Sequence, residues 1–187
     1  MNHCIAKLWH SRFAENAFRG FLAGALALAT CGIAAAQLDS DQNLKFKGAI
    51  GVIPVTGVAA NGTVNLNIVK GVNPGAPWRI ADLNANIDPD GHIRVVGRGL
   101  LLATGNGIGT NARQSVHASL FCTSGTTVTE HDSNLAGVAL DANGDFRIDD
   151  YLSTVPPTPC GGPVLLIRNV GGVWFAAGIP KLDTDAR

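Results

Sequence analysis

The spacing of turn residues is the feature that most constrains the fold of this chain. From Lys45 onward, short runs of β-branched and apolar residues are separated by Gly, Asn, Asp and Pro, and no segment shows apolar residues at the helical period of 3.6. About ten short strands at this spacing, with no low-complexity linker between them, are typical of one antiparallel domain. We therefore predict an all-β, single-domain antiparallel β-sandwich, with a β-barrel as the alternative.

The candidate strands are runs bounded by turn residues, and they cover residues 46–55, 63–69, 78–87, 92–103, 115–122, 126–130, 136–140, 145–148, 164–170 and 173–179. Three turn sequences predict how neighbouring runs connect. "DPDG" at 88–91 has Pro and Gly where a β-turn favours them, and "DANGD" at 141–145 contains Asn-Gly. Together with "NVGG" at 169–172, they predict that each turn joins the strands on either side of it.

Two segments alternate strictly between apolar and polar positions. In "TVNLNIV", residues 63–69, Val64, Leu66 and Ile68 share one face, which we expect to be the core face. In "SVHASLFC", residues 115–122, the even positions through Cys122 are expected to face the core. The odd positions, among them His117, are expected to face solvent.

Two other segments suggest positions within the sheet. "PVLLI" at 163–167 is continuously apolar, which predicts a central strand covered on both sides. "KFKGAIGVIPV" at 45–55 contains Pro54, and proline cannot donate a ladder hydrogen bond. We therefore expect that segment to form an edge strand.

The N-terminus has the layout of a secretory signal peptide. Basic residues precede the apolar run "FLAGALALATCGIAAA" at 21–36, which ends in three alanines that suit signal peptidase. The run of 16 residues is shorter than the roughly 20 that a spanning helix needs, which argues against a retained membrane anchor. Residues 1–36 are therefore predicted to be removed, which leaves 37–187 as a secreted or periplasmic domain without a transmembrane span. Lipid anchoring at Cys31 is a minor alternative, because Thr30 fits a lipoprotein signal poorly.

Two cysteines remain after removal of the signal segment. Cys122 and Cys160 would enter an oxidising compartment together, where pairing is the usual outcome. Closing a loop of about 39 residues would stabilise the fold by roughly 4 kcal/mol on the chain-entropy model. A metal site or a catalytic thiol is the rival interpretation, and neither finds a histidine at ligand spacing.

The charge of the predicted mature domain argues against nucleic acid as a partner. Residues 37–187 contain 11 Lys and Arg against 13 Asp and Glu, with no basic run. The electrostatic footprint that phosphate backbones require is therefore missing.

The glycine-rich stretch "GRGLLLATGNGIGTNARQS" at 97–115 superficially suggests a phosphate-binding loop. A dinucleotide fingerprint needs Gly where this chain has Thr110, followed by a helix, whereas the next segment has the period of a strand. A Walker loop needs a lysine, and there is none between Lys70 and Lys181. The stretch is predicted to connect two strands, and no cofactor is expected.

Metal sites find equally little support. Asp141, Asn143 and Asp145 match the first three ligand positions of a calcium loop, but Phe146 and Leu152 replace the required Gly and Glu. A hairpin turn explains these residues without a metal. The histidines after the signal segment, His92, His117 and His131, stand alone rather than in pairs at metal-binding spacing.

Three patterns bear on binding or catalysis. Charged residues in strands could form a polar patch for a ligand, or simply a solvated sheet face; they are Arg79, Asp82, Arg94 and Arg98. Trp78, Trp174 and Phe175 could form a carbohydrate platform, but aromatic residues in strands belong more often to the core. A Ser–His–Asp arrangement has no sequence signature here, since a G-x-S-x-G elbow is absent.

The C-terminal half, about residues 93–180, carries the strings "GRGLLLATGNGIGT", "GDFRIDD" and "CGGPVLLIRNVGGVWFAAGI". In these it resembles a group of secreted bacterial β-rich proteins with no assigned activity. The resemblance implies export and a β fold, and it brings no catalytic residues.

We therefore expect an exported binding or structural module of the cell envelope or secretome. Its partner would be a small molecule, a glycan or an envelope protein. The alternative is an extracytoplasmic hydrolase with an active site on loops such as 105–113. A cleft in which His117 or His131 meets a Ser or Asp would favour the hydrolase, whereas a flat face bearing exposed Trp or Phe would favour the binding module.

Overall fold

A computed structural model of the chain describes residues 43–181. The predicted signal segment, residues 1–36, and the alternative anchor at Cys31 lie outside these residues. The strands are β1 (Leu44–Gly51), β2 (Val55–Val58), β3 (Val64–Leu66), β4 (Trp78–Arg79), β5 (Asp82–Ile87), β6 (His92–Arg98), β7 (Leu101–Leu102), β8 (Ser115–Ser124), β9 (Thr127–Asp132), β10 (Val138–Ala139), β11 (Phe146–Tyr151), β12 (Val164–Asn169) and β13 (Trp174–Pro180). One short 3-10 helix, η1 (Gly105–Gly107), precedes β8.

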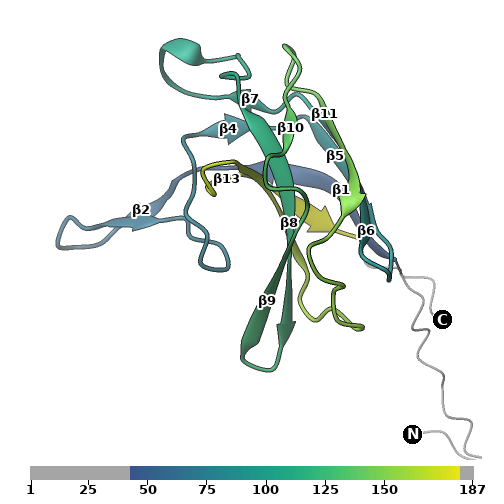
Figure 1. Cartoon of the computed structure of the whole chain (residues 1–187). Helices are drawn as coiled ribbons and strands as arrows, with labels where there is room; N and C mark the ends of the chain where they lie inside the picture. The colour runs from purple at the N-terminus through teal and green to yellow at the C-terminus, as the bar shows by residue number, and fades with distance from the viewer. Residues whose placement is uncertain (1–42, 182–187) are drawn as a thin grey trace, which may run out of the picture. The chain divides into compact units, whose positions relative to one another are not determined.

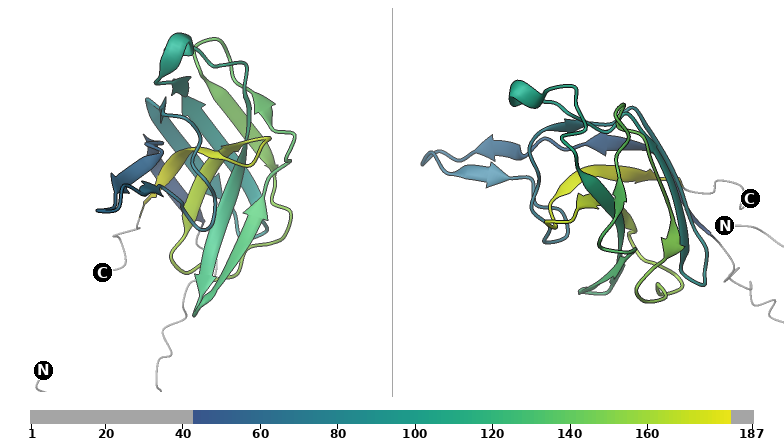
Figure 2. Two further views of the ribbon diagram at one scale, coloured as in Figure 1. Left: turned by 90° about the vertical axis from the view of Figure 1, so that its left-hand side faces the viewer. Right: turned by 45° about the horizontal axis from the view of Figure 1, so that its top comes forward.

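Nine of these strands form one antiparallel sheet that curls into a half-barrel (Figures 1 and 2). Their order is β10-β8-β12-β13-β1-β5-β6-β11, and β9 pairs with β8 beside β10. The predicted all-β antiparallel class is therefore confirmed, in a form consistent with either a sandwich or a barrel.

The core lies where alternate residues of the strands point to one side of the sheet. Leu83 and Ile87 of β5, with Ile93 and Val95 of β6, are buried, while their neighbours along each strand are largely exposed. This is the period of two expected for a sheet with one buried face. The turn at 88–91 joins β5 and β6 in the predicted hairpin, in which the Asp88 amide donates to the His92 carbonyl at 2.9 Å.

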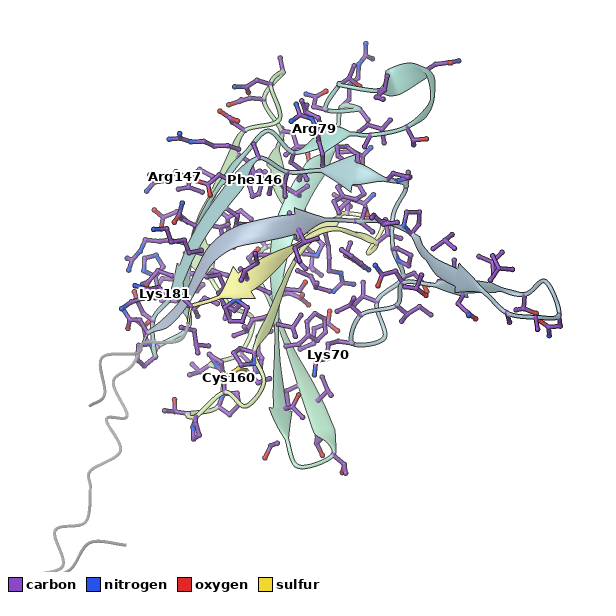
Figure 3. All side chains as sticks on the ribbon, turned by 180° about the vertical axis from the view of Figure 1, so that it is seen from behind. Lys70, Arg79, Phe146, Arg147, Cys160 and Lys181 are labelled. Carbon is purple, nitrogen blue, oxygen red and sulfur yellow. A yellow bond between two sulfur atoms is a disulfide. The ribbon has the colours of Figure 1, made fainter. Side chains whose placement is uncertain are left out.

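Strand β12 is central, as predicted, and its residues Leu165, Leu166 and Ile167 are fully buried. The neighbouring strand β8 corrects one expectation. Its odd positions were predicted to face solvent, yet His117, Ser119 and Phe121 are all buried. Beyond these residues on the same side of β8, Lys70 Nζ from the segment after β3 donates to Thr123 Oγ1 at 2.8 Å (Figure 3).

Strand β1 corrects a second expectation. It was predicted to be an edge strand, but it lies inside the sheet between β13 and β5. Pro54 falls after the end of β1, in the connection to β2, so it removes no ladder hydrogen bond.

The turn at 141–145 forms as predicted, with the Asp141 amide donating to the Asp145 carbonyl at 2.9 Å. The two strands that it joins then separate: β10 pairs with β8, and β11 pairs with β6. Bonds between backbone and side-chain groups bridge the seam between β10 and β11 instead, for example from the Asn134 amide to Asp150 Oδ2 at 2.7 Å. The turn at 169–172 behaves more simply, because it joins β12 and β13 in the predicted pair.

Cys122 and Cys160 form the predicted disulfide, with a Cα–Cα distance of 5.0 Å. It ties β8 to the segment before β12 (Figure 3). Such a bond is compatible with an oxidising, extracytoplasmic compartment. Residues 43–181 contain no helix that is long and apolar enough to cross a membrane.

Candidate binding surface

Strands β2 and β3 form a separate two-stranded ribbon, residues 53–68, which projects away from the main sheet (Figures 1 and 2). Val55 lies opposite Leu66, and Val58 lies opposite Val64. A register shift between Val55 and Gly57 inserts one extra residue into β2. Because of this bulge, both cross-strand pairs share one side, which we call the apolar face of the ribbon.

The apolar face corrects a third expectation. The alternation in 63–69 places Val64 and Leu66 on one face as predicted, but this face is not part of the core. Val64 is 50% exposed and Leu66 is 51% exposed, and Val55, Val58 and Ile68 are exposed as well. The ribbon stands clear of the sheet, so no other described element covers these side chains.

The ribbon also lacks charge. No Asp, Glu, Lys or Arg occurs between Lys47 and Lys70. Its second face carries polar but uncharged groups, among them Asn65. An exposed apolar surface without nearby charge is a recognised mark of an interaction site.

The base of the ribbon is fixed to the body of the protein. The buried Trp174 indole donates from Nε1 to the Asn67 carbonyl at 3.0 Å, and Asn67 Nδ2 donates to the Ile53 carbonyl at 3.0 Å. Just beyond, Lys70 bonds to Thr123 of β8. These bonds hold the ribbon's orientation, so a partner would meet a surface that is already arranged.

A second projecting hairpin provides an internal comparison. The β8–β9 hairpin extends beyond the sheet, and its tip, residues 123–127, reads "TSGTT" (Figure 1). Hydroxyl side chains and glycine suit a loop that stays in water. The two projecting hairpins therefore differ in chemistry, and only the ribbon has one face covered with valine and leucine.

The predicted polar patch is partly assembled on the outer face of β5, β6 and β11. Asp82 lies opposite Arg98, and Arg94 shares their face, whereas Arg79 lies apart on β4 (Figure 3). The charges of this face largely neutralise one another. Arg94 Nη2 bonds to Asp88 Oδ2 at 2.7 Å, in keeping with a solvated sheet face.

His92 and Asp149 form the best-defined polar pair on that face. His92 Nε2 donates to Asp149 Oδ1 at 2.8 Å, and its Nδ1 accepts from Arg94 Nη1 at 3.1 Å. Hydrogen bonds from Arg147 and His92 hold the pKa of Asp149 below its usual range. Since both ring nitrogens of His92 are engaged, neither is directed at a nucleophile as a catalytic base would be.

Among the described aromatic residues, only Tyr151 is largely exposed, at 61%. It stacks on His92, with ring centroids 4.8 Å apart. Trp78 and Phe175 stack inside the core at 4.2 Å, and Trp174 is buried beside them. The core interpretation of these three aromatics is confirmed, and they form no exposed platform.

The other two histidines do not form the arrangement that a hydrolase would need. His131 bonds through Nδ1 to Thr154 and through Nε2 to Thr129. His117 is 2% exposed, and within residues 43–181 neither of its ring nitrogens has a hydrogen-bond partner. Burial, together with the positive charge of Arg168, lowers the pKa of His117.

Arg168 organises a polar cluster that the sequence analysis did not anticipate. Its guanidinium bonds to Glu130 and, at 3.1 Å, to Ser119 Oγ, while the Ser119 hydroxyl donates to Asp132. The cluster lies across β8, β9 and β12. Each serine and carboxylate there already has a partner, which suits a structural role.

The glycine-rich stretch connects β7 to β8, as predicted, through the single turn η1. At the former calcium candidate, the carboxylate of Asp145 accepts bonds from the Gly99 amide and from Asn143 Nδ2, each at 2.9 Å. No group of three or more His, Cys, Asp or Glu within residues 43–181 is arranged to hold a metal ion.

Two shallow hollows of about 350 and 240 Å³ lie along the seam beside β10, and Val138 lines both. Asp145 lines the first, and Asp150 lines the second. Both carboxylates already accept backbone hydrogen bonds, whereas Arg98 and Asp141 also line the first hollow.

Comparison of the chain with protein-family models, curated proteins and solved structures finds no match. Of the surfaces described, the apolar face of the ribbon is the one formed by apolar side chains that are exposed to water. From the sequence, Val64 and Leu66 were predicted to lie in the core, and Val55 and Val58 were not recognised as part of this surface. The absence of charged residues from 48 to 69 could have indicated it.

Proposed function

We propose that this protein is an exported, non-catalytic binding module of the cell envelope or secretome that attaches to its partner through the apolar face of the ribbon. The observation that carries the proposal is the exposure of Val55, Val58, Val64 and Leu66 on one side of an anchored ribbon. A fully buried Val or Leu side chain contributes about 1.5–3 kcal/mol. Covering four half-exposed side chains would therefore contribute roughly 3–6 kcal/mol.

Export is part of the proposal. The signal layout of residues 1–36 and the Cys122–Cys160 disulfide both support it. No specific observation favours the hydrolase alternative, because the described histidines are either fully engaged or buried without a serine partner.

Site-specific photo-cross-linking in an exporting bacterial host tests the proposal. A benzophenone amino acid would replace Val58 on the apolar face, and in a matched strain it would replace Asn65 on the opposite face. We expect irradiation to give a discrete cross-linked product from position 58 and little or none from position 65. Equal yields from both positions, or no product from position 58, would refute the proposed function.

A further inference from the structure

We infer that the partner of the ribbon is the ribbon of a second copy of this chain, with the two apolar faces packed together about a two-fold axis. The inference rests on the proposed function and adds the identity of the partner. Three features of the ribbon support this partner: its open edges, its lack of charge and the arrangement of its two apolar pairs.

The open edges argue against a lipid partner. Within the described residues, β2 pairs only with β3 and β3 only with β2, so each strand leaves one row of backbone amides and carbonyls unpaired. Hydrocarbon cannot satisfy these groups, and open sheet edges do not occur there exposed to lipid. The polar face with Asn65 and Asn67 would have to be buried as well. A protein surface avoids both problems, because it can cover the apolar face and leave the edges and asparagines in water.

The absence of charge favours a partner that is itself uncharged. A ribbon with no ionised group from 48 to 69 offers nothing for an oppositely charged surface to recognise. Two copies of such a ribbon can approach without like-charge repulsion. The surface that matches this requirement within the described chain is the ribbon itself.

The two apolar pairs also match themselves under two-fold symmetry. The pair Val55–Leu66 lies near the base of the ribbon, and the pair Val58–Val64 lies nearer the tip. When two ribbons pack in opposite directions, the base pair of one copy lies over the tip pair of the other. This is an isologous contact, in which the same patch serves both partners.

The contact can extend beyond the four central side chains. Ile53, just before β2, and Ile68, just after β3, are 68% and 54% exposed. The bonds from Trp174 to Asn67 and from Asn67 to Ile53 keep this base in place. A preorganised surface loses less conformational freedom on association.

Sedimentation equilibrium of the full-length gene product, purified after processing by an exporting host, tests the inference. Over a hundredfold range of concentration, we expect the mass to rise from one protomer towards two. Leu66→Asn places an amide on the apolar face and should weaken the dimer at least tenfold. Asn65→Ser, on the opposite face, is the matched control and should leave the dimer unchanged. At concentrations low enough for all forms to be monomeric, thermal unfolding of both variants should match that of the parent, because neither residue is in the core.

Three outcomes would overturn the inference: a monomer at every concentration, a dimer that Leu66→Asn leaves intact, or Leu66-dependent binding to phosphatidylethanolamine–phosphatidylglycerol vesicles. The cross-linking experiment separates its failure from that of the proposed function. A monomer that still cross-links from position 58 to a different protein would refute the second copy but support the binding module. Absence of any product from position 58 would refute the binding module itself.

Discussion

Replacing Gly97 with alanine should destabilise the protein strongly, for a purely steric reason. Gly97 of β6 lies directly opposite Phe146 of β11, which is labelled in Figure 3. The buried phenyl ring occupies the space where a side chain at position 97 would begin. A Cβ atom at position 97 would lie 2.1 Å from Cε1 and 2.2 Å from Cζ of Phe146. Carbon atoms in van der Waals contact are about 3.5–4.0 Å apart, so the ring would have to move by more than 1 Å.

The expected loss follows from what the ring can do. If Phe146 shifts within the core, overpacking costs about 1–3 kcal/mol. If the ring leaves its site, the loss approaches the 3–5 kcal/mol typical of deleting a buried phenylalanine. We therefore expect Gly97→Ala to lower the free energy of unfolding by about 2–4 kcal/mol. That is a large part of the roughly 5–15 kcal/mol usual for a domain.

Urea denaturation, followed by tryptophan fluorescence, measures the effect. The matched control is Gly57→Ala, also in a strand, where a new Cβ meets nothing within 4 Å. This control should change stability by no more than about 1 kcal/mol, the range of the Gly-to-Ala backbone effect. In a Phe146→Leu background, Gly97→Ala should lower the free energy of unfolding by at least about 1 kcal/mol less than it does in the parent. Interaction energies of about this size are usual between residues in contact. Equal effects of the alanines at 97 and 57 would refute the steric argument.

Three further predictions concern His117, the disulfide and the anchor of the ribbon. Because the pKa of His117 is lowered from 6.5 in the folded state, its contribution to stability is complete above pH 6.5 and declines as the pH falls towards the folded-state pKa. In urea titrations from pH 7.5 to 5.5, the free energy of unfolding should fall by up to about 1.4 kcal/mol per pH unit, and His117→Leu should reduce this slope. An unreduced slope would contradict the lowered pKa of His117. Replacing both Cys122 and Cys160 with alanine should cost about 4 kcal/mol of unfolding free energy by calorimetry; a loss below 1 kcal/mol would show that the bond does not constrain the unfolded chain. Trp174→Phe removes the donor to Asn67, and should speed amide exchange in residues 53–68 more than in the β8–β9 hairpin; uniform acceleration would argue against a specific anchor.

Local patterns in the sequence were sufficient to predict most strands and turns. The alternation of apolar and polar residues in β5 and β6, together with the turn sequence "DPDG" between them, is a local signal. The hairpin could therefore be predicted without knowledge of the rest of the chain. The pairing of Cys122 with Cys160 followed from the compartment and from the cysteine count.

Properties that depend on distant parts of the chain were predicted less well. Alternation shows which residues share a face, but not whether another element covers that face. It therefore placed Val64 and Leu66 in the core, although the ribbon projects from the sheet. It also placed His117 in solvent, although that side of β8 is buried too. The interior position of β1 depends on pairing with β13, at the other end of the chain, which no local pattern records.

Amide hydrogen exchange of residues 53–68 shows whether the apolar face of the ribbon is covered when the protein functions. Exchange would be measured by mass spectrometry on protein isolated under gentle conditions from exporting cells, and again after high dilution. The β8–β9 hairpin tip at 123–127 serves as the internal control, because it is exposed and polar. We expect slower exchange in the ribbon before dilution than after it, and no change at the control tip. Equal exchange of the ribbon in both states would contradict this expectation.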